Sequence, residues 1–323
     1  MTESGSLMRE QIDTIKRLIT MKFAFYTSVF GDLSLQEITG WAKDAGFDGV
    51  EIDFGRHIKE PEHTASAVGI AREAGLEVCA ITVFGNMLDR DADARNRIRN
   101  QVSQVFAEAS GINIPALVVF PGRNESISED RNYEDIAEFF AGLLAKGSSG
   151  TKVVIENWPG MNKNFVATTP SGWRRLFSLV KSANLGLEFD PSHLLWQGID
   201  PVPVVLEFAN RIHLVHAKDT KLERDQIQDV GYCGNWWEYR LPGRGELDWR
   251  EFLGFLIRKT GFSGFASIEH EDREFGWPDG SIDARKEGLL NALAVLRDSV
   301  VYAEGRAQRI GFGFSPKPQQ AER

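Results

Sequence analysis

The sequence predicts an α/β fold: a single (β/α)8 TIM barrel with long loops after strands 7 and 8. Short apolar segments alternate with longer amphipathic segments along the whole chain, which is the pattern of parallel strands joined by helices. No linker or second unit interrupts the alternation, and 323 residues leave room for one barrel of roughly 250 residues with extensions. Eight strand–helix units of this kind close into a barrel whose strands are all parallel.

The first half of the chain contains four strand–helix units. The first helix begins at a capping box, in which Ser34 and Glu37 each accept a hydrogen bond from the other's backbone N–H. Glycines in C-cap positions are expected to end the four helices: Gly46, Gly75, Gly111 and Gly147. The expected strands cover residues 22–27, 48–53, 76–83 and 116–120, and the expected helices 34–45, 64–74, 94–110 and 133–146.

The second half repeats the pattern, and its strands end in polar residues: Glu156, Asp190, His216 and Glu269. The expected helices cover residues 170–182, 201–209, 249–259 and 282–298. An open doubly wound sheet is the rival fold, but no Gly-x-Gly-x-x-Gly follows the first strand to hold a dinucleotide. We therefore expect three parts: a helical N-terminal extension (1–21), the barrel (22–300) and a C-terminal tail (301–323).

The composition limits the classes of partner. The formal net charge is −9, which disfavours nucleic acid, and no apolar segment approaches the roughly 18–20 residues that span a membrane. Cys79 and Cys233 are the only cysteines, so they make no disulfide framework and fit a reducing compartment. We therefore expect a cytoplasmic protein with no nucleic-acid or membrane partner.

The polar residues at the four strand ends are all of metal-ligand type. In a barrel the carboxyl ends of the strands form one rim, where the active site is built. Any one of the four has an ordinary alternative, such as capping a helix or filling the core. Four on successive strands favour a shared metal site, with Glu156, Asp190, His216 and Glu269 as the ligands. Three carboxylates and one imidazole favour a divalent ion: Mn²⁺ first, with Mg²⁺ or Co²⁺ as alternatives.

Five short motifs contain or adjoin these residues: Ile155-Glu-Asn-Trp-Pro159, Phe189-Asp-Pro-Ser-His193, His216-Ala-Lys-Asp219, Pro242-Gly-Arg-Gly-Glu-Leu-Asp-Trp249 and Ser267-Ile-Glu-His-Glu271. Together they resemble the sugar phosphate isomerase/epimerase family, the xylose-isomerase-like TIM barrels, over about residues 22–298. The resemblance implies the same four metal ligands and makes Glu156 and Glu269 the catalytic acid/base pair. It also implies that His193 contacts the substrate or a metal-bound water, and that Lys218 supplies a cation beside the substrate.

The predicted function is that of a divalent-metal-dependent sugar isomerase or epimerase acting on a ketose or keto sugar. Removing a proton next to a carbonyl is difficult because the enediolate is unstable, and a divalent ion stabilises its charge. Two carboxylates on opposite sides of the sugar can then exchange protons with its two faces. If the intermediate instead expels a group β to the carbonyl, the enzyme is a lyase. The inosose dehydratases and C-glycoside deglycosidases of related fold do this.

Five further residues are candidates for substrate binding: Asp53, Asn157, Trp237, Arg240 and Arg244. Asp53 ends the second strand and is expected to contact either the substrate or a neighbouring basic side chain. The aromatic residues of the long loop 218–244 suit either the faces of a sugar or a neighbouring subunit. Arg244 suits either an acidic group of the substrate or the turn that contains it.

The expected partners are a small-molecule carbohydrate and further protein subunits. The resemblance implies a homo-oligomer or a complex with a small partner subunit. The related apurinic endonucleases need extra histidines on early strands, whereas the third strand here, which ends at Phe84-Gly85, has none. A non-catalytic barrel is disfavoured because all four ligands are present.

Overall fold

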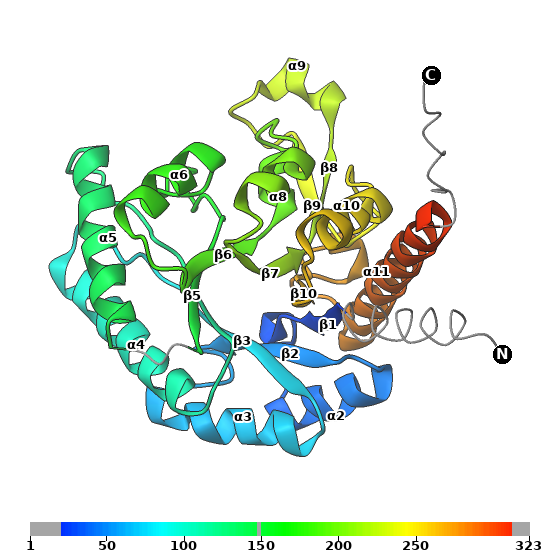
Figure 1. Ribbon diagram of the computed structural model, residues 1–323, viewed down its shortest axis with the longest axis horizontal. Helices are drawn as coiled ribbons and strands as arrows, with labels where there is room; N and C mark the ends of the chain where they lie inside the picture. Colours follow the sequence, from blue (N-terminus) through cyan, green and yellow to red (C-terminus); the bar gives the residue numbers. More distant parts are fainter. Residues whose placement is uncertain (1–20, 147–149, 312–323) are drawn as a thin grey trace, which may run out of the picture.

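The computed structural model describes residues 21–146 and 150–311, and it shows a barrel of eight parallel strands (Figure 1). Consecutive strands of the barrel are hydrogen-bonded neighbours, except for β1 and β2, which close the barrel. Neighbouring strands are hydrogen-bonded in this order: β1 (Lys22–Phe25), β10 (Phe265–Ile268), β7 (Ile212–Ala217), β6 (Leu185–Phe189), β5 (Lys152–Glu156), β4 (Ala116–Val119), β3 (Glu77–Val83) and β2 (Gly49–Phe54).

A backbone bridge closes the barrel between its first two strands. β1 and β2 stand at the two ends of the strand order, and a parallel bridge joins Tyr26 to Glu51. Beside it, the Asp53 backbone N–H donates a hydrogen bond to the Thr27 hydroxyl (2.9 Å). The predicted (β/α)8 barrel is therefore confirmed, and the open doubly wound sheet is excluded.

Helices surround the barrel on its outside (Figure 1): α2 (Leu35–Ala45), α3 (Thr64–Glu73), α4 (Ala92–Gly111), α5 (Glu129–Leu144), α6 (Pro170–Leu179), α8 (Pro201–Phe208), α10 (Trp249–Phe255) and α11 (Ile282–Gly311). Shorter helical segments lie in the connections: η1 (Thr27–Phe30), η2 (Pro61–His63), α7 (Pro191–Leu195), η3 (Arg224–Gln226), α9 (Ile227–Val230), η4 (Leu256–Thr260) and η5 (Arg273–Phe275). The predicted capping box begins α2, with Ser34 and Glu37 bonded as expected.

Helices α11 and α4 end at other residues than predicted. Helix α11 continues to Gly311, so the tail predicted to begin at residue 301 is wrong up to that point. No proline interrupts residues 299–311, and nothing there ends the helix. Helix α4 includes Gly111, and Asn113 takes the left-handed conformation instead (φ 58°). The predicted N-terminal helix, residues 312–323 and Gly147 lie outside the described residues.

Small apolar side chains fill the lower interior of the barrel. Successive residues of a strand point to opposite faces, so each strand gives one set of side chains to the interior and another to the helices. Ala24, Cys79, Val118 and Val154 belong to a compact buried cluster that is separate from the larger core beneath the helices. The polar side chains at the carboxyl ends of the strands are therefore followed, deeper in the barrel, by apolar side chains.

The long loop after β7 contains a hairpin that the sequence analysis did not foresee. β8 (Asp219–Leu222) and β9 (Trp237–Arg240) pair antiparallel, and η3 and α9 lie between them. The Thr220 hydroxyl donates a hydrogen bond to the Ser192 carbonyl oxygen in α7 (2.8 Å). This bond holds the hairpin beside the carboxyl ends of β6 and β7.

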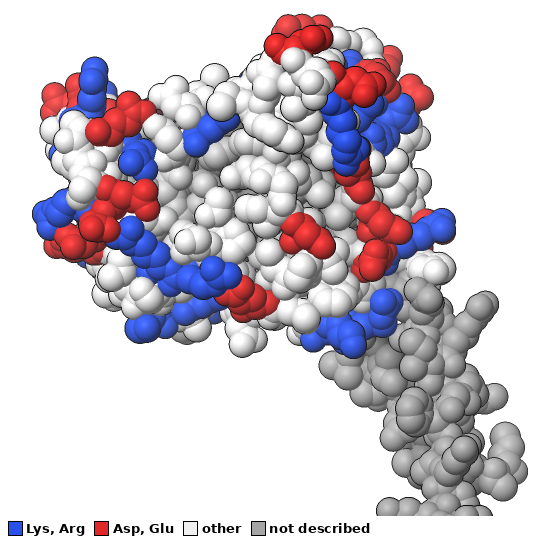
Figure 2. Space-filling model, turned by 90° about the horizontal axis from the view of Figure 1, so that it is seen from above, with Lys and Arg blue, Asp and Glu red and all other residues white. Residues whose placement is uncertain are grey.

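The surface carries charges of both signs. Figure 2 shows one face of the molecule, on which acidic and basic side chains are interspersed around an uncharged centre. Exposed ion pairs such as Arg174–Glu207 contribute little to stability, because water competes for both partners. Within the described part of the chain, no helix is long and apolar enough to cross a membrane.

Asp219 ties the exit of β7 to the segment that precedes α10. Its buried carboxylate accepts hydrogen bonds from four N–H donors: the backbone of Thr220 (2.8 Å), Leu247 (3.1 Å) and Gly243 (3.3 Å), and the Trp249 indole (3.0 Å). Gly245 comes so close that a Cβ there would lie 2.5 Å from the Thr220 carbonyl oxygen. The motifs His216-Ala-Lys-Asp219 and Pro242-Gly-Arg-Gly-Glu-Leu-Asp-Trp249 therefore contact each other through Asp219.

We predict that Asp219→Asn destabilises the fold. The substitution turns one acceptor oxygen into a donor that faces other donors, which costs about 1–3 kcal/mol of unfolding free energy. Urea denaturation followed by circular dichroism measures the loss. Asp248→Asn is the matched control, because Asp248 caps α10 at the surface and Asn caps helices equally well. Equal midpoints for the two variants would contradict the prediction.

Candidate metal centre

The four predicted ligands meet at the carboxyl ends of four neighbouring strands. Glu156 ends β5, Asp190 follows β6, His216 lies in β7 and Glu269 follows β10. Ligand atoms of Glu156, Asp190 and His216 all lie within 4.8 Å of one another. The His216 Nδ1 atom is 3.3 Å from Glu269 Oε2, which brings the fourth side chain to the same place.

The facing atoms of these side chains fit a divalent cation. Glu156 Oε1, Asp190 Oδ2 and His216 Nδ1 are buried, and no hydrogen bond satisfies them within the described residues. Buried polar atoms without a hydrogen bond are costly, so native structures seldom leave three of them facing one another. A divalent ion bound by Glu156, Asp190, His216 and Glu269 would satisfy all three, and carboxylate oxygens with one imidazole suit Mn²⁺ or Mg²⁺.

The excess of acidic side chains around the candidate ligands also favours binding of a cation. Lys218 is the ammonium group that contacts the site, and it is 2% exposed. This ammonium, even together with the charge of His216, does not balance the surrounding acids, and uncompensated charge is expensive to bury. Six carboxyl groups gather here: Glu51, Glu156, Glu188, Asp190, Glu269 and Glu271.

Opposite shifts separate the two predicted acid/base residues. Burial raises the pKa of Glu156 to about 8, and the charge of nearby Glu269 adds to the effect. Burial alone would also raise the pKa of Glu269, but the charges of Lys218 and His216 outweigh it and hold that pKa well below its ordinary value. In the absence of an ion, Glu269 is therefore the ionised carboxylate and Glu156 the protonated one at neutral pH.

His193 lies over the same group of ligands. Its Nε2 atom is 3.2 Å from Glu156 Oε1 and 3.4 Å from Asp190 Oδ2, and its Nδ1 atom is 3.0 Å from the Tyr239 hydroxyl. Burial and the neighbouring Lys218 charge lower the pKa of His193 to about 3, so the imidazole is neutral. A neutral imidazole here is placed to exchange hydrogen bonds with a ligand without adding charge.

Lys218 also lies where the sequence predicted a cation. Its Nζ is 3.2 Å from Asp190 Oδ2 and 3.1 Å from Glu271 Oε2, and it donates a hydrogen bond to Glu269. Burial lowers the pKa of Lys218, but these carboxylates outweigh burial and raise it well above its ordinary value. The sequence analysis assigned no role to Glu271, although its position two residues after Glu269 places both side chains on one face of an extended segment.

Asn157 and Asp53 have protein partners. The Asn157 side chain donates to the Asp190 carbonyl oxygen and accepts from the Asp190 N–H, both at 2.8 Å. It therefore fixes the backbone of a candidate ligand. Asp53 accepts a hydrogen bond from the Tyr26 hydroxyl (2.5 Å), and the Tyr26 ring lies 5.8 Å from the His216 ring. The substrate contacts predicted for Asn157 and Asp53 stay predictions.

The candidates from the long loop lie farther out. The Arg240 guanidinium is bound to Asp272 (2.9 Å) and Glu238 (3.1 Å), and Arg244 is bound to Glu274 (2.8 Å). The contacts with Asp272 and Glu274 bind these two arginines to the loop after β10, rather than to the four candidate ligands. The substrate roles of Arg240 and Arg244 also stay predictions.

Trp237 is part of an aromatic stack formed within the chain itself. It stacks on Trp196 with ring centroids 4.3 Å apart, and the Lys163 ammonium lies 4.3 Å from its centroid. The two partners expected for the loop aromatics were a sugar and a second subunit, so the structure adds a third. The substrate contact of Trp237 stays a prediction.

A second group of aromatic residues stands beside Glu156. The Trp158 backbone N–H donates to Glu156 Oε2 (3.0 Å), and its ring contacts Phe84 and Phe120 with centroids 5.3 and 5.9 Å apart. Phe84 is 59% exposed, although large apolar side chains next to a core are usually covered. We call these three residues the aromatic wall. The sequence analysis missed it because its members follow three different strands.

With the fold and the site described, comparison with known proteins is informative. The family of xylose isomerase-like TIM barrels matches residues 40–299. The chain belongs to this family. The family predicted from the sequence motifs is thereby confirmed.

Several curated proteins are similar in sequence to this chain. The uncharacterized protein YfiH of Bacillus subtilis is 23% identical over 320 residues, which cover 85% of this chain and 100% of YfiH. The rhizopine catabolism protein MocC of Rhizobium meliloti is 25% identical and covers 75% of this chain and 76% of MocC. An inosose dehydratase of Clostridium beijerinckii is 27% identical over 40% of this chain and 43% of its own length.

Solved structures show the same xylose isomerase-like barrel. The 3-keto-D-glucoside 4-epimerase YcjR of E. coli aligns with a TM-score of 0.64 at 17% identity, covering 86% of this chain and 100% of YcjR. A D-psicose 3-epimerase solved in the presence of D-fructose aligns with a TM-score of 0.66 at 17% identity, covering 86% and 99%. At such identities the likeness shows a shared fold.

We predict that Mn²⁺ raises the thermal stability of the chelator-treated protein. Binding to the folded state alone contributes about 2.7 kcal/mol when the ion is at about 100 times its Kd. Differential scanning calorimetry with and without Mn²⁺ measures the shift in Tm. Asp190→Asn should abolish the shift. Asp200→Asn should keep it, because both residues cap short helices but only Asp190 faces the site. A Tm independent of Mn²⁺ would refute the metal centre.

Proposed function

We propose that this chain is a divalent-metal-dependent sugar isomerase or epimerase that acts on a ketose or keto sugar. The observation that carries the proposal is the convergence of two carboxylates, Glu156 and Glu269, on one ligand group from strands with β6 and β7 between them. Such a pair can reach a bound sugar from different sides. Solved proteins of the same fold include a D-psicose 3-epimerase and a 3-keto-D-glucoside 4-epimerase, which supports this class of reaction.

In this mechanism the acid/base pair moves the protons. A bound divalent ion, Mn²⁺ by preference, supplies Lewis-acid stabilisation of the charge that develops on the sugar oxygens. One carboxylate of the pair takes the proton from the carbon next to the carbonyl, and the other returns a proton to the opposite face. Return to the same carbon gives an epimer, and return to the neighbouring carbon gives the aldose–ketose isomer.

Neighbouring residues orient these groups. Asn157 fixes the backbone of Asp190 through two hydrogen bonds, and Lys218 holds Glu269 by direct contact. His193 presents a neutral ring next to Glu156, where it can exchange a hydrogen bond with a sugar hydroxyl. Catalysis gains from such fixed geometry because little reorganisation is needed during the reaction.

The aromatic wall supports a sugar as the substrate. The rings of Phe84 and Trp158 contact each other, and the Trp158 backbone is hydrogen-bonded to Glu156, so the aromatic wall offers apolar surface near a predicted catalytic carboxylate. A sugar ring has an apolar C–H face and polar edges, so it can pack on such a wall while its oxygens face the polar groups. A nucleic-acid substrate is disfavoured by the net charge of −9.

A lyase of the same family is the second candidate. The curated relatives include inosose dehydratases, one of them 27% identical over 40% of this chain. Elimination of a hydroxyl or an aglycone also begins with removal of a proton next to a carbonyl, and it then needs an acid at the leaving group. Glu271 and Lys218 lie beside Glu269 and offer additional proton-bearing groups for that step.

Two further parts of the proposal concern the setting of the enzyme. We infer a cytoplasmic location from its two unpaired cysteines, one buried and one exposed. We also infer that it acts as a homo-oligomer or with a small partner subunit, in line with the resemblance of its motifs. Sedimentation of the purified protein tests the second inference.

We predict deuterium exchange at the carbon next to the carbonyl of the true substrate. The Mn²⁺-loaded protein is incubated in D₂O with ketoses, inososes and 3-oxo-glycosides, and the products are analysed by NMR after removal of Mn²⁺. Glu156→Gln and Glu269→Gln should each slow exchange by roughly 100-fold or more. Glu77→Gln, at the opposite end of the barrel, should leave it unchanged.

The products distinguish the two candidate functions. Deuterium in an otherwise unchanged sugar, or in its isomer, supports the isomerase or epimerase. An unsaturated product with loss of water or aglycone supports the lyase. Metal-loaded protein that exchanges no proton in any of the three sugar classes would contradict both.

A further inference from the structure

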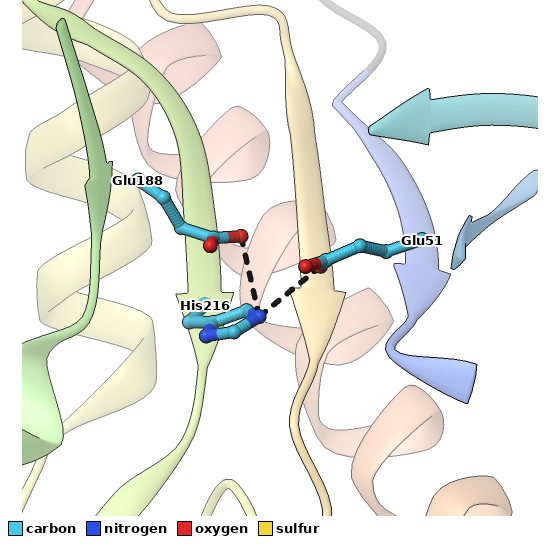
Figure 3. A group of neighbouring side chains, drawn as sticks. All are labelled: Glu51, Glu188 and His216. Carbon is cyan, nitrogen blue, oxygen red and sulfur yellow. Dashed lines mark hydrogen bonds and ion pairs between the residues drawn. The ribbon is translucent and has the colours of Figure 1, made fainter. Parts of the chain in front are cut away.

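A second layer of acidic side chains lies inside the barrel next to the candidate metal ligands. Glu51 on β2 and Glu188 on β6 both point toward the ring of His216 on β7 (Figure 3). Both glutamates are fully buried. Glu188 precedes Asp190 by two residues, so it faces the same side of the strand one step deeper. The predicted mechanism assigns no role to either glutamate.

Only one of the two glutamates is hydrogen-bonded to His216. The His216 Nε2 atom lies 3.1 Å from Glu51 Oε2 and 3.2 Å from Glu188 Oε1. The Glu51 contact has hydrogen-bond geometry, whereas neither oxygen of Glu188 makes a hydrogen bond to any described residue. A single N–H serves one acceptor well, and the geometry selects Glu51.

Glu51 is itself held from two sides. Its other carboxylate oxygen accepts a hydrogen bond from the Thr82 hydroxyl on β3. Its backbone forms the bridge to Tyr26 that closes the barrel. The acceptor for His216 is therefore fixed both through its side chain and through the frame of the barrel.

The direction of this bond decides which nitrogen faces the ligand group. An imidazole that donates from Nε2 to a carboxylate binds a metal through the lone pair of Nδ1, and the carboxylate makes that nitrogen a better ligand. His216 Nδ1 is buried without a hydrogen bond and lies 3.3 Å from Glu269 Oε2. The ring therefore spans the distance between Glu51 on one side and the ligand group on the other.

We propose that Glu51 is a positioning residue that orients His216 and thereby sets the metal affinity of the site. The inference rests on the proposed metal-dependent function. Glu188 crowds the same nitrogen from the other side but does not orient it. Glu51 and Glu188 are thus equally buried and nearly equally distant from Nε2, but only Glu51 is predicted to affect the metal affinity.

The first experiment compares Glu51→Gln with Glu188→Gln. Mn²⁺ binding to the chelator-treated proteins is measured by titration calorimetry, with circular dichroism to show that both variants are folded. Loss of such an outer partner typically weakens metal binding roughly 10- to 100-fold, and we expect Glu51→Gln to fall at about the lower end because the amide still accepts a bond. We expect Glu188→Gln to stay within about threefold of the unaltered protein.

A second readout reports the bond itself. In the Co²⁺-loaded protein, the His216 Nε2–H should give an exchangeable proton signal shifted by the paramagnetic ion. Glu51→Leu removes the acceptor and should abolish the signal through rapid exchange with water, whereas Glu188→Gln should keep it. A merely structural role of Glu51 would leave the signal unchanged in a folded variant.

The outcomes separate this inference from the proposed function. Unaltered protein that binds no Mn²⁺ would overturn both. Unaltered protein that binds Mn²⁺, with Glu51→Gln equally tight or Glu188→Gln equally weakened, would overturn the role of Glu51 alone. Two equivalents of Mn²⁺, with one lost in each variant, would also overturn it, because Glu51, Glu188 and His216 would then hold a second ion. Selective weakening in Glu51→Gln supports it.

Discussion

The burial of acidic groups at one end of the barrel is the constraint on which the site depends. Parallel strands bring their carboxyl ends together, so polar side chains from distant parts of the sequence meet where little water remains. Carboxylates in such a place repel one another and lose hydration. Lys218 and His216 relieve part of this repulsion, as the lowered pKa of Glu269 shows, while burial still raises the pKa of Glu156 to about 8. A divalent cation bound by these ligands would complete the balance.

Fixed hydrogen bonds prevent these groups from moving apart. Asn157 links β5 to β6 through two hydrogen bonds with the backbone of Asp190. Just after β7, the Asp219 carboxylate accepts hydrogen bonds from four N–H donors. Glu51 does the same for the His216 ring from across the barrel. None of these three side chains needs to touch a substrate to matter. Each instead fixes the position of a backbone segment or a side chain next to the candidate ligands.

Local patterns predicted the fold and the meeting of the four ligand candidates. An apolar segment that ends in Glu156 or His216 reads as a barrel strand with its polar end at the rim, and that reading needs no knowledge of other segments. The capping box at Ser34 is local in the same way. The length of α11 was misjudged because the chain after Ala303 is rich in Gly, Pro and Gln, although its first proline comes only at Pro316, beyond the end of the helix.

Features that depend on pairing across the chain could not be predicted. Glu51 and Glu188 sit on different strands, and only the closed barrel shows that both reach the same imidazole nitrogen. The hairpin of β8 and β9 has a long, irregular connection, so no two-residue turn marked it in the sequence. Arg240 appeared free to bind substrate because Asp272, one of its partners, lies 32 residues later in the chain.

The ligand group alone does not decide between isomerase and lyase, because both reactions begin with the same proton transfer. They differ in where the second proton goes: to a carbon face in one, to a leaving oxygen or carbon in the other. The groups beside Glu269 bear on this choice. Lys218 lies between Glu269 and Glu271, and burial raises the pKa of Glu271 to about 6 although the Lys218 charge opposes it. A proton can therefore reside on Glu271 close to neutral pH while Glu269 stays ionised, so the substrate's own leaving group decides which reaction follows.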